Sequence, residues 1–184
     1  MNSKILQYLL DNKTQEFTIN QLAKATKTNY RIAHTQIKLF ETQKIVKTKR
    51  VGTSLLCSLT QEFNEHIYLA ECQRRKELPK KIIRIQNKLS QIKHPFIALL
   101  FGSYAKKTQS TFSDIDILVV SENEKEIRTI VDLIPENIHL TIVSYESFIK
   151  MNSSKEFTVV SEAIKNNIIL LGIEEYYRLL QNAG

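Results

Sequence analysis

Apolar residues recur at helical spacing at the start of the chain. Within 4–10 they form one face of a predicted helix, which the polar run 11–13 is expected to end. A short extended piece follows at 16–19. Asn20 is then the expected cap of a second helix over 21–27.

A third helical pattern begins at Thr28 or Asn29, and its inward side chains recur at Ala33, Ile37 and Phe40. The opposite face carries hydrogen-bond donors and cations of the kinds that reach base edges and phosphates: Asn29, Tyr30, Arg31, His34, Thr35 and Lys38. Packing of the tyrosine against the domain is the alternative for that residue, and a lone exposed histidine by itself indicates only solvation.

Two extended segments, 45–50 and 55–59, flank Gly52, a residue that tolerates the positive φ of a tight turn. They predict a β-hairpin whose first strand carries three cations: Lys47, Lys49 and Arg50. Three helices followed by a basic hairpin resemble the winged helix-turn-helix family in order and length, and in the aliphatic pair Ile45-Val46.

This resemblance implies that residues 1–60 bind double-stranded DNA. The third helix is then expected to enter the major groove, and the hairpin cations to contact phosphates or the minor groove. The alternative is a small helical domain that docks onto protein and whose basic face is merely solvated.

The segment 61–93 contains no glycine and carries two helical stripes, with Pro79 either dividing two helices or beginning the second. The first stripe is Phe63, Ile67 and Ala70. We expect a helical linker whose first stripe is either the seam of a homodimer or a face packed within the chain. Basic residues at 74–84 either extend the DNA-facing surface or form the solvated side of a helix.

A buried-strand pattern at 96–101 leads directly into Gly102 and Ser103, and Asp114 and Asp116 open a second apolar strand. Because side chains alternate along a strand, the two carboxylates share one face. They repel each other and are costly to hold together unless a divalent cation lies between them. Gly102 allows a phosphate to approach closely, and backbone N–H groups with the Ser103 hydroxyl can bind its oxygens.

A strand, Gly-Ser, a short helix and turn, and Asp-x-Asp entering the next strand are together similar to the polymerase-β-like nucleotidyltransferases, in particular the minimal nucleotidyltransferases. The resemblance covers about 93–184. It implies that Asp114 and Asp116 are catalytic and bind two Mg²⁺ ions, and that Gly102 and Ser103 hold a nucleoside triphosphate.

The sequence departs from this family at two positions. Lys107 stands where members usually have a small residue, often glycine. The family also places a third carboxylate on a later strand, but alternate positions of the predicted strand 138–143 offer His139, Thr141 or Val143 and no acid. Histidine is a poor ligand for Mg²⁺, which prefers oxygen.

Two nearby acids are candidates for replacing the missing carboxylate. Glu136 lies at the approach to that strand, and Asp132 lies on the predicted acidic helix over 122–134. Without such a replacement, nucleotide binding is expected to survive better than nucleotide transfer.

The remaining patterns predict helices over 145–150, 156–166 and 173–180 and a strand over 168–171, with Phe157 among the buried residues. We therefore expect an α+β chain with three parts. These are a winged helix-turn-helix over 1–60, a helical linker over 61–93, and a small α/β nucleotidyltransferase domain with a mixed sheet over 94–184.

Charge separates the two ends of the chain. Residues 1–60 hold ten basic and three acidic residues, a net of +7, whereas residues 96–184 hold eight basic and twelve acidic, a net of −4. A basic front end indicates a polyanionic partner, and the acidic remainder argues against a second basic platform.

Composition narrows the class of protein further. With 184 residues, 42% apolar and 24% charged, the chain can form one domain or two small ones and is not disordered. The longest apolar run, 96–101, is far too short to span a membrane. Cys57 and Cys72 fit neither a zinc site nor a disulfide framework, so we expect reduced thiols in a cytoplasmic protein.

Two functions follow from these patterns. One is a DNA-binding protein with a Mg²⁺-dependent domain that transfers a nucleotide from a nucleoside triphosphate to an acceptor. The other is a transcription regulator, antitoxin-like or not, whose transferase domain is catalytically degenerate and senses nucleotide. Because minimal nucleotidyltransferases often occur with a partner protein, a protein partner is a third alternative.

Overall fold

The structure is a computed structural model that describes residues 4–154 and 156–182. The chain forms two compact units, Met1–Glu71 and Cys72–Gly184, and the division falls inside helix α4 (Glu65–Lys76). Of the residues described, none belongs to a helix long and apolar enough to cross a membrane. The part boundaries expected from the sequence, after 60 and after 93, stay predictions.

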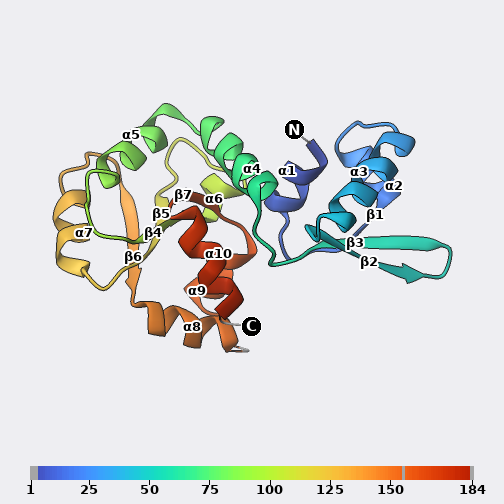
Figure 1. Cartoon of the computed structure of the whole chain (residues 1–184). Helices are drawn as coiled ribbons and strands as arrows, with labels where there is room; N and C mark the ends of the chain where they lie inside the picture. Colours follow the sequence, from blue (N-terminus) through green and yellow to red (C-terminus); the bar gives the residue numbers. More distant parts are fainter. Residues whose placement is uncertain (1–3, 155, 183–184) are drawn as a thin grey trace. The chain divides into compact units, whose positions relative to one another are not determined.

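The first unit has the arrangement of a winged helix-turn-helix (Figure 1). Its three strands pair antiparallel in the order β1-β3-β2, and the β2–β3 hairpin extends beyond the helices of this unit as the wing. The elements are α1 (Lys4–Asp11), β1 (Phe17–Thr18), α2 (Ile19–Ala25), α3 (Tyr30–Thr42), β2 (Val46–Val51) and β3 (Ser54–Leu59).

Capping residues fix where the helices of the first unit begin. Of the two expected caps of α3, Thr28 and Asn29, the observed one is Asn29, whose side chain accepts a hydrogen bond from the Arg31 amide at 2.8 Å. The expected cap of α2, Asn20, is wrong, because Thr18 caps that helix and forms a reciprocal capping box with Gln21. The hairpin turns at Gly52 with φ +58°, as the sequence predicts.

The end of α4 is buried in the second unit. Arg74 is only 4% exposed and donates to the Asn167 carbonyl at 2.8 Å, and Arg75 donates to the Leu170 carbonyl at 3.0 Å. These two guanidinium groups therefore form neither a solvated helix face nor an extension of a DNA-binding surface. From the first expected stripe, Ile67 is buried, while its role in a homodimer stays a prediction.

A mixed four-stranded sheet with the order β6-β5-β4-β7 lies at the centre of the second unit. The β5–β6 pair is parallel, and β4 pairs antiparallel with β5 and with β7. The strands are β4 (Ile97–Leu100), β5 (Ile115–Val120), β6 (Ile138–Val143) and β7 (Ile168–Leu171). The helices are α5 (Lys80–Leu89), α6 (Gly102–Ala105), α7 (Glu124–Val131), α8 (Tyr145–Ser153), α9 (Val159–Lys165) and α10 (Ile173–Asn182).

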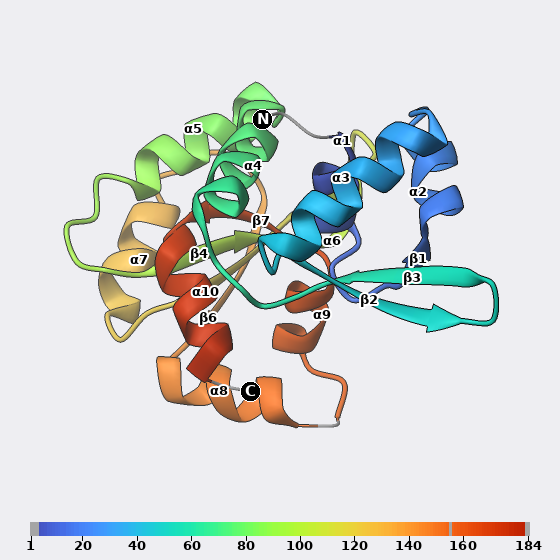
Figure 2. The same ribbon diagram turned by 45° about the vertical axis from the view of Figure 1, so that its right-hand side comes forward.

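Helices cover both faces of this sheet (Figure 2). The apolar sides of α5 and α7 pack on one face, in a core that includes Ile82, Ile85, Ile117, Val119 and Ile127. Strand β4 is buried along its whole length, which requires cover on both faces. The paired aspartates lie at the start of β5, which pairs with this buried strand.

The expectation that Phe157 is buried is wrong. Its side chain is 75% exposed, because Thr158 caps α9 and the helix begins only at Val159, after the phenylalanine. The ring lies instead beneath the ammonium group of Lys165, 5.8 Å from the ring centroid.

Candidate functional site

The turn after β4 brings Gly102 against Asp116. The amide of Phe101 donates to the Asp116 carbonyl at 3.0 Å, which joins the end of β4 to the start of β5. Gly102 has φ +65°, and a Cβ added there would lie 2.0 Å from the Oδ2 atom of Asp116. A larger residue would be strained at this positive φ and would displace the Asp116 carboxylate, so both conformation and space favour glycine here.

The parallel pairing of β5 and β6 sets two polar side chains beside the aspartates. Asp116 is in register with His139, whose Nδ1 lies 3.2 Å from Oδ1 of Asp116. Two residues earlier on the same face, the Asn137 amide donates to Oδ1 of Asp114, and the Asn137 carbonyl accepts from the Ile115 amide at 3.0 Å. The Asp114–Asp116 pair thus faces an amide and an imidazole.

Asn137 was not identified from the sequence. Its position two residues before His139 was the available signal, because alternate residues of a strand share a face. That signal identifies a partner for Asp114 only once the register between β5 and β6 is known.

Neither proposed replacement completes a set of three acids. Glu136 is paired with Arg84, with 3.2 Å between Oε1 and Nη2, and Asp132 caps the end of α7. Over residues 4–154 and 156–182, no group of three or more His, Cys, Asp or Glu side chains is placed to hold a metal ion. The expected third carboxylate is therefore not grouped with the pair in the described chain.

Lys107 keeps the backbone conformation that glycine would adopt at this position. Its φ is +58°, in the left-handed region. The amide of Thr108 donates to the Ser103 carbonyl at 3.0 Å, and the amide of Lys107 to that of Tyr104 at 3.4 Å. This pair of bonds is a Schellman motif, which ends α6. The lysine therefore preserves the hydrogen bonds that end α6, at some cost in backbone strain.

The loop between α6 and Asp114 is held by serine hydrogen bonds. The Ser113 hydroxyl accepts from the Ser110 amide at 2.8 Å, and the Ser110 hydroxyl accepts from the Phe112 amide at 3.3 Å. Phe112 is 94% exposed. Lys106, at the start of this loop, is paired with Glu162 at 3.2 Å.

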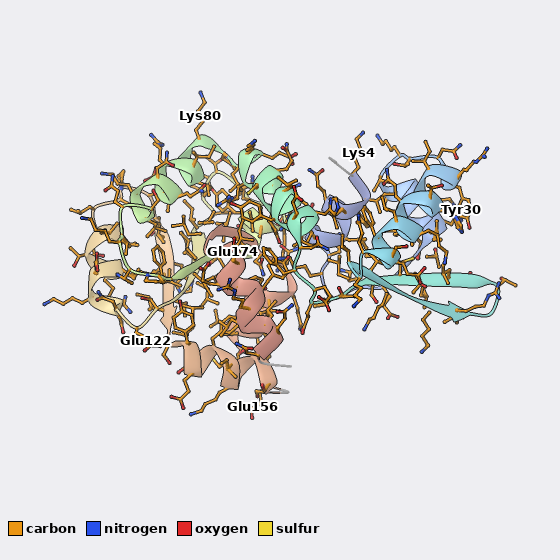
Figure 3. The ribbon with its side chains drawn as sticks, viewed as in Figure 1. Lys4, Tyr30, Lys80, Glu122, Glu156 and Glu174 are labelled. Carbon is orange, nitrogen blue, oxygen red and sulfur yellow. The ribbon has the colours of Figure 1, made fainter. Side chains whose placement is uncertain are left out.

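A second site lies in the first unit, where α3 and the wing enclose a cleft of about 560 Å³. Four of the residues expected to bind DNA line it: Tyr30, His34, Lys38 and Arg50. Tyr30 is at the first turn of α3, where Figure 3 labels its side chain. The rest of the lining was not predicted and consists of four polar residues, Thr18, Asn20, Thr53 and Ser54, and two apolar ones, Ile19 and Leu55.

The other five expected DNA-binding residues are exposed but do not line this cleft: Asn29, Arg31, Thr35, Lys47 and Lys49. Two of them have local hydrogen-bonding roles. The Asn29 side chain caps α3, and the Thr35 hydroxyl donates to the Arg31 carbonyl at 3.0 Å. Side chains alternate along β2, so Lys47 and Lys49 project on the side opposite to Arg50.

Glu41 modifies the charge of the cleft. Its carboxylate accepts from Lys38 at 2.8 Å and from the Thr48 hydroxyl. The hydrogen bond from Lys38, followed by the one from Thr48, lowers the pKa of Glu41 below its usual value. Lys38 is therefore paired within α3 and contributes less positive charge to the cleft than Arg50.

The mixed sheet, the Gly-Ser turn and the adjoining aspartates define the second unit as a nucleotidyltransferase domain. The family model described as "Polymerase beta, Nucleotidyltransferase" matches residues 80–176, more than half of the chain, and the chain belongs to this family. The match begins at α5, ahead of the start expected from the sequence.

Similarity to other known proteins is weak. Reduced HlyU from Vibrio cholerae is 15% identical, with a TM-score of 0.34 over 42% of this chain and 80% of that chain. ZitR from Lactococcus lactis is 18% identical, with a TM-score of 0.33 over 50% of this chain and 63% of that chain. No curated protein matches the chain.

Proposed function

We propose that this protein is a DNA-binding regulator whose nucleotidyltransferase domain binds a magnesium–nucleoside triphosphate complex but no longer transfers the nucleotide. The observation that carries the proposal is His139, an imidazole in register with Asp116, at the place where the family resemblance leads us to expect a carboxylate. Nucleotide binding and nucleotide transfer are thereby separated, because binding depends on Asp114 and Asp116 whereas transfer also depends on the third carboxylate of the family.

The donor atoms of the site fit one Mg²⁺ ion better than two. Mg²⁺ is commonly held by one or two carboxylates together with substrate phosphates, and Asp114 and Asp116 supply such a pair. A second ion needs further oxygen ligands, whereas His139 offers nitrogen. When bound, the ion would neutralise phosphate charge and orient the triphosphate.

The residues around the pair have defined tasks in this proposal. Gly102 leaves room for Asp116 and exposes backbone to a phosphate, and the Ser103 hydroxyl can donate to a phosphate oxygen. Asn137 orients Asp114 through its amide. Gly102, Ser103 and Asn137 carry no basic group that would accept the proton of an attacking hydroxyl, a role that the family resemblance gives to the third acid.

The DNA half of the proposal rests on the first unit. Helix α3 and the wing form a cleft with polar and cationic lining, and the surrounding sequence carries a net charge of +7 over residues 1–60. This combination suits a duplex, with α3 in the major groove and Arg50 of the wing near the backbone.

Binding and turnover of labelled nucleotide distinguish the two functions. We expect the full chain to bind ATP with Mg²⁺ in equilibrium dialysis, the Asp114→Ala variant to lose that binding, and neither to release pyrophosphate. Turnover by the unmodified chain would overturn the proposal that the domain binds nucleotide without transferring it. Absence of binding by the unmodified chain would overturn both functions.

An active enzyme is the second candidate, and a specific observation favours it. The Gly102-Ser103 turn and the Asp114–Asp116 pair, to which the family resemblance gives nucleotide and metal binding, lie beside each other. Pyrophosphate release that requires Asp116 and a supplied acceptor would establish this alternative.

A further inference from the structure

The loop that joins the two halves of the nucleotide site presents an aromatic ring to solvent. Phe112 is 94% exposed, and the loop containing it runs from α6, which begins at Gly102, to Asp114. Single exposed apolar side chains are common on protein surfaces, so exposure alone indicates nothing. The position of this ring between the expected phosphate turn and the carboxylate pair is what distinguishes it.

The distance along the chain keeps the ring close to the site. Phe112 lies two positions before Asp114, and a fully extended chain covers about 7 Å over that interval. A nucleotide whose phosphates lie at Asp114 therefore has its base within reach of a side chain from this loop. Leu133, which is 73% exposed, follows α7 and has no such connection to the aspartates.

Hydrogen bonds give the loop a defined shape. Ser110 and Ser113 bind each other through backbone and hydroxyl groups, and the Phe112 amide donates to the Ser110 hydroxyl. A backbone held in such a turn loses little conformational freedom when a planar ligand stacks on the Phe112 ring.

We infer that Phe112 is a stacking platform for the base of the nucleoside triphosphate bound at Asp114 and Asp116. This inference rests on the proposed function, and it adds a base-binding position to a site otherwise described by its phosphate and metal contacts. A phenyl ring offers no hydrogen bonds, so the platform accepts every base and favours purines through their larger stacking area.

Comparison of ATP with inorganic tripolyphosphate tests this position, because the two ligands share a triphosphate and differ in the nucleoside. Calorimetry with Mg²⁺ present is expected to show tighter binding of ATP by the unmodified chain. Phe112→Ala should weaken ATP binding by about 5- to 100-fold and leave tripolyphosphate binding unchanged. Phe112→Tyr keeps a ring and should retain the affinity for ATP.

Phe157→Ala is the matched control, since Phe157 is also an exposed phenylalanine of the second unit but lies just before α9, outside the loop that joins α6 to Asp114. It should change neither affinity. If Phe112→Ala weakens the binding of ATP and of tripolyphosphate equally, the loop is disturbed and the inference is overturned. Unchanged affinity for both ligands would also overturn it.

Two further outcomes separate this inference from the function on which it rests. If the unmodified chain binds ATP and tripolyphosphate equally, base stacking is refuted while nucleotide binding stands. If it binds neither, both are refuted. Phe112→Ala could instead weaken binding of a single-stranded oligonucleotide but not of ATP. The ring would then stack on a base of single-stranded nucleic acid, and its assignment to the nucleoside triphosphate would be overturned.

Discussion

The Nδ1 atom of His139 lies 3.2 Å from Oδ1 of Asp116, on the adjacent parallel strand and in direct register. The other oxygen of the same carboxylate, Oδ2, is the atom that a Cβ at Gly102 would meet. Asp116 is therefore bounded on one side by the turn at Gly102 and on the other by the His139 imidazole. A carboxylate at 139 would adjoin the same group.

This relationship predicts that His139→Asp gains nucleotide transfer. The new carboxylate would add oxygen ligands beside Asp116, and we expect pyrophosphate release at least about tenfold above the background measured with the unmodified chain, equivalent to about 1.4 kcal/mol of barrier. Labelled ATP with candidate acceptors provides the measurement. His139→Asn, which has the size of aspartate without its charge, is the control. Equal rates for the two variants would contradict the prediction.

Lys107 provides a prediction about stability. A side chain in the left-handed region costs about 1 kcal/mol relative to glycine, so Lys107→Gly should raise the free energy of unfolding by about 0.5–1 kcal/mol in urea. The neighbouring Lys106 caps α6 with φ −77° and pairs with Glu162, so Lys106→Gly should instead lower it. Loss of stability in both variants would show that the lysine at 107 contributes more than its backbone strain.

A lysine in the place that glycine usually takes also explains why the end of α2 was predicted two residues too late. Lys27 has a positive φ of 52° and ends α2 with backbone bonds of the same type as those at Lys107, and Lys44, with φ 58°, does the same after α3. Glycine is the usual sequence signal for this ending, and the chain contains only four glycines. The periodic apolar residues still located the helices themselves.

Much of the candidate site follows from local sequence because strand alternation and the glycine turn are short-range properties. The identification of Gly102 and of Asp114 with Asp116 required no knowledge of the tertiary fold. The hydrogen bond from Asn137 to Asp114 and the burial of Arg74 depend on segments that are distant in the sequence and meet in the fold. Arg74, for example, donates to a carbonyl 93 residues away. Such pairings leave no periodic signal in one sequence.

Arg50 is predicted to contribute more to DNA binding than Lys49. Arg50 lines the cleft beside α3, whereas Lys49 projects on the opposite side of β2. Arg50→Ala should weaken binding of duplex DNA about tenfold and reduce the slope of log affinity against log salt by about 1. Fluorescence anisotropy at several salt concentrations measures both quantities. Lys49→Ala removes the same charge, and an equal effect would place the DNA outside the cleft.

Cys57 links burial to the pH dependence of folding. Its thiol is fully buried on β3, and burial, assisted by the charge of Glu41, raises the pKa of Cys57 from 9.0 to about 11. The native thiol therefore stays protonated at pH 8, and a thiol reagent should label it only after unfolding. Cys72, which is partly exposed, should react in the native protein.

The sign of the effect on stability follows from proton release. Between pH 9 and about 11 the unfolded chain loses the Cys57 proton while the native chain retains it, so the free energy of unfolding should fall as the pH rises. Tyr145 also has a pKa raised by burial, so the pH dependence must be compared with that of Cys57→Ala. Urea unfolding should give a flatter pH profile for this variant. Parallel profiles would show that Cys57 titrates in the native state as it does in the unfolded chain.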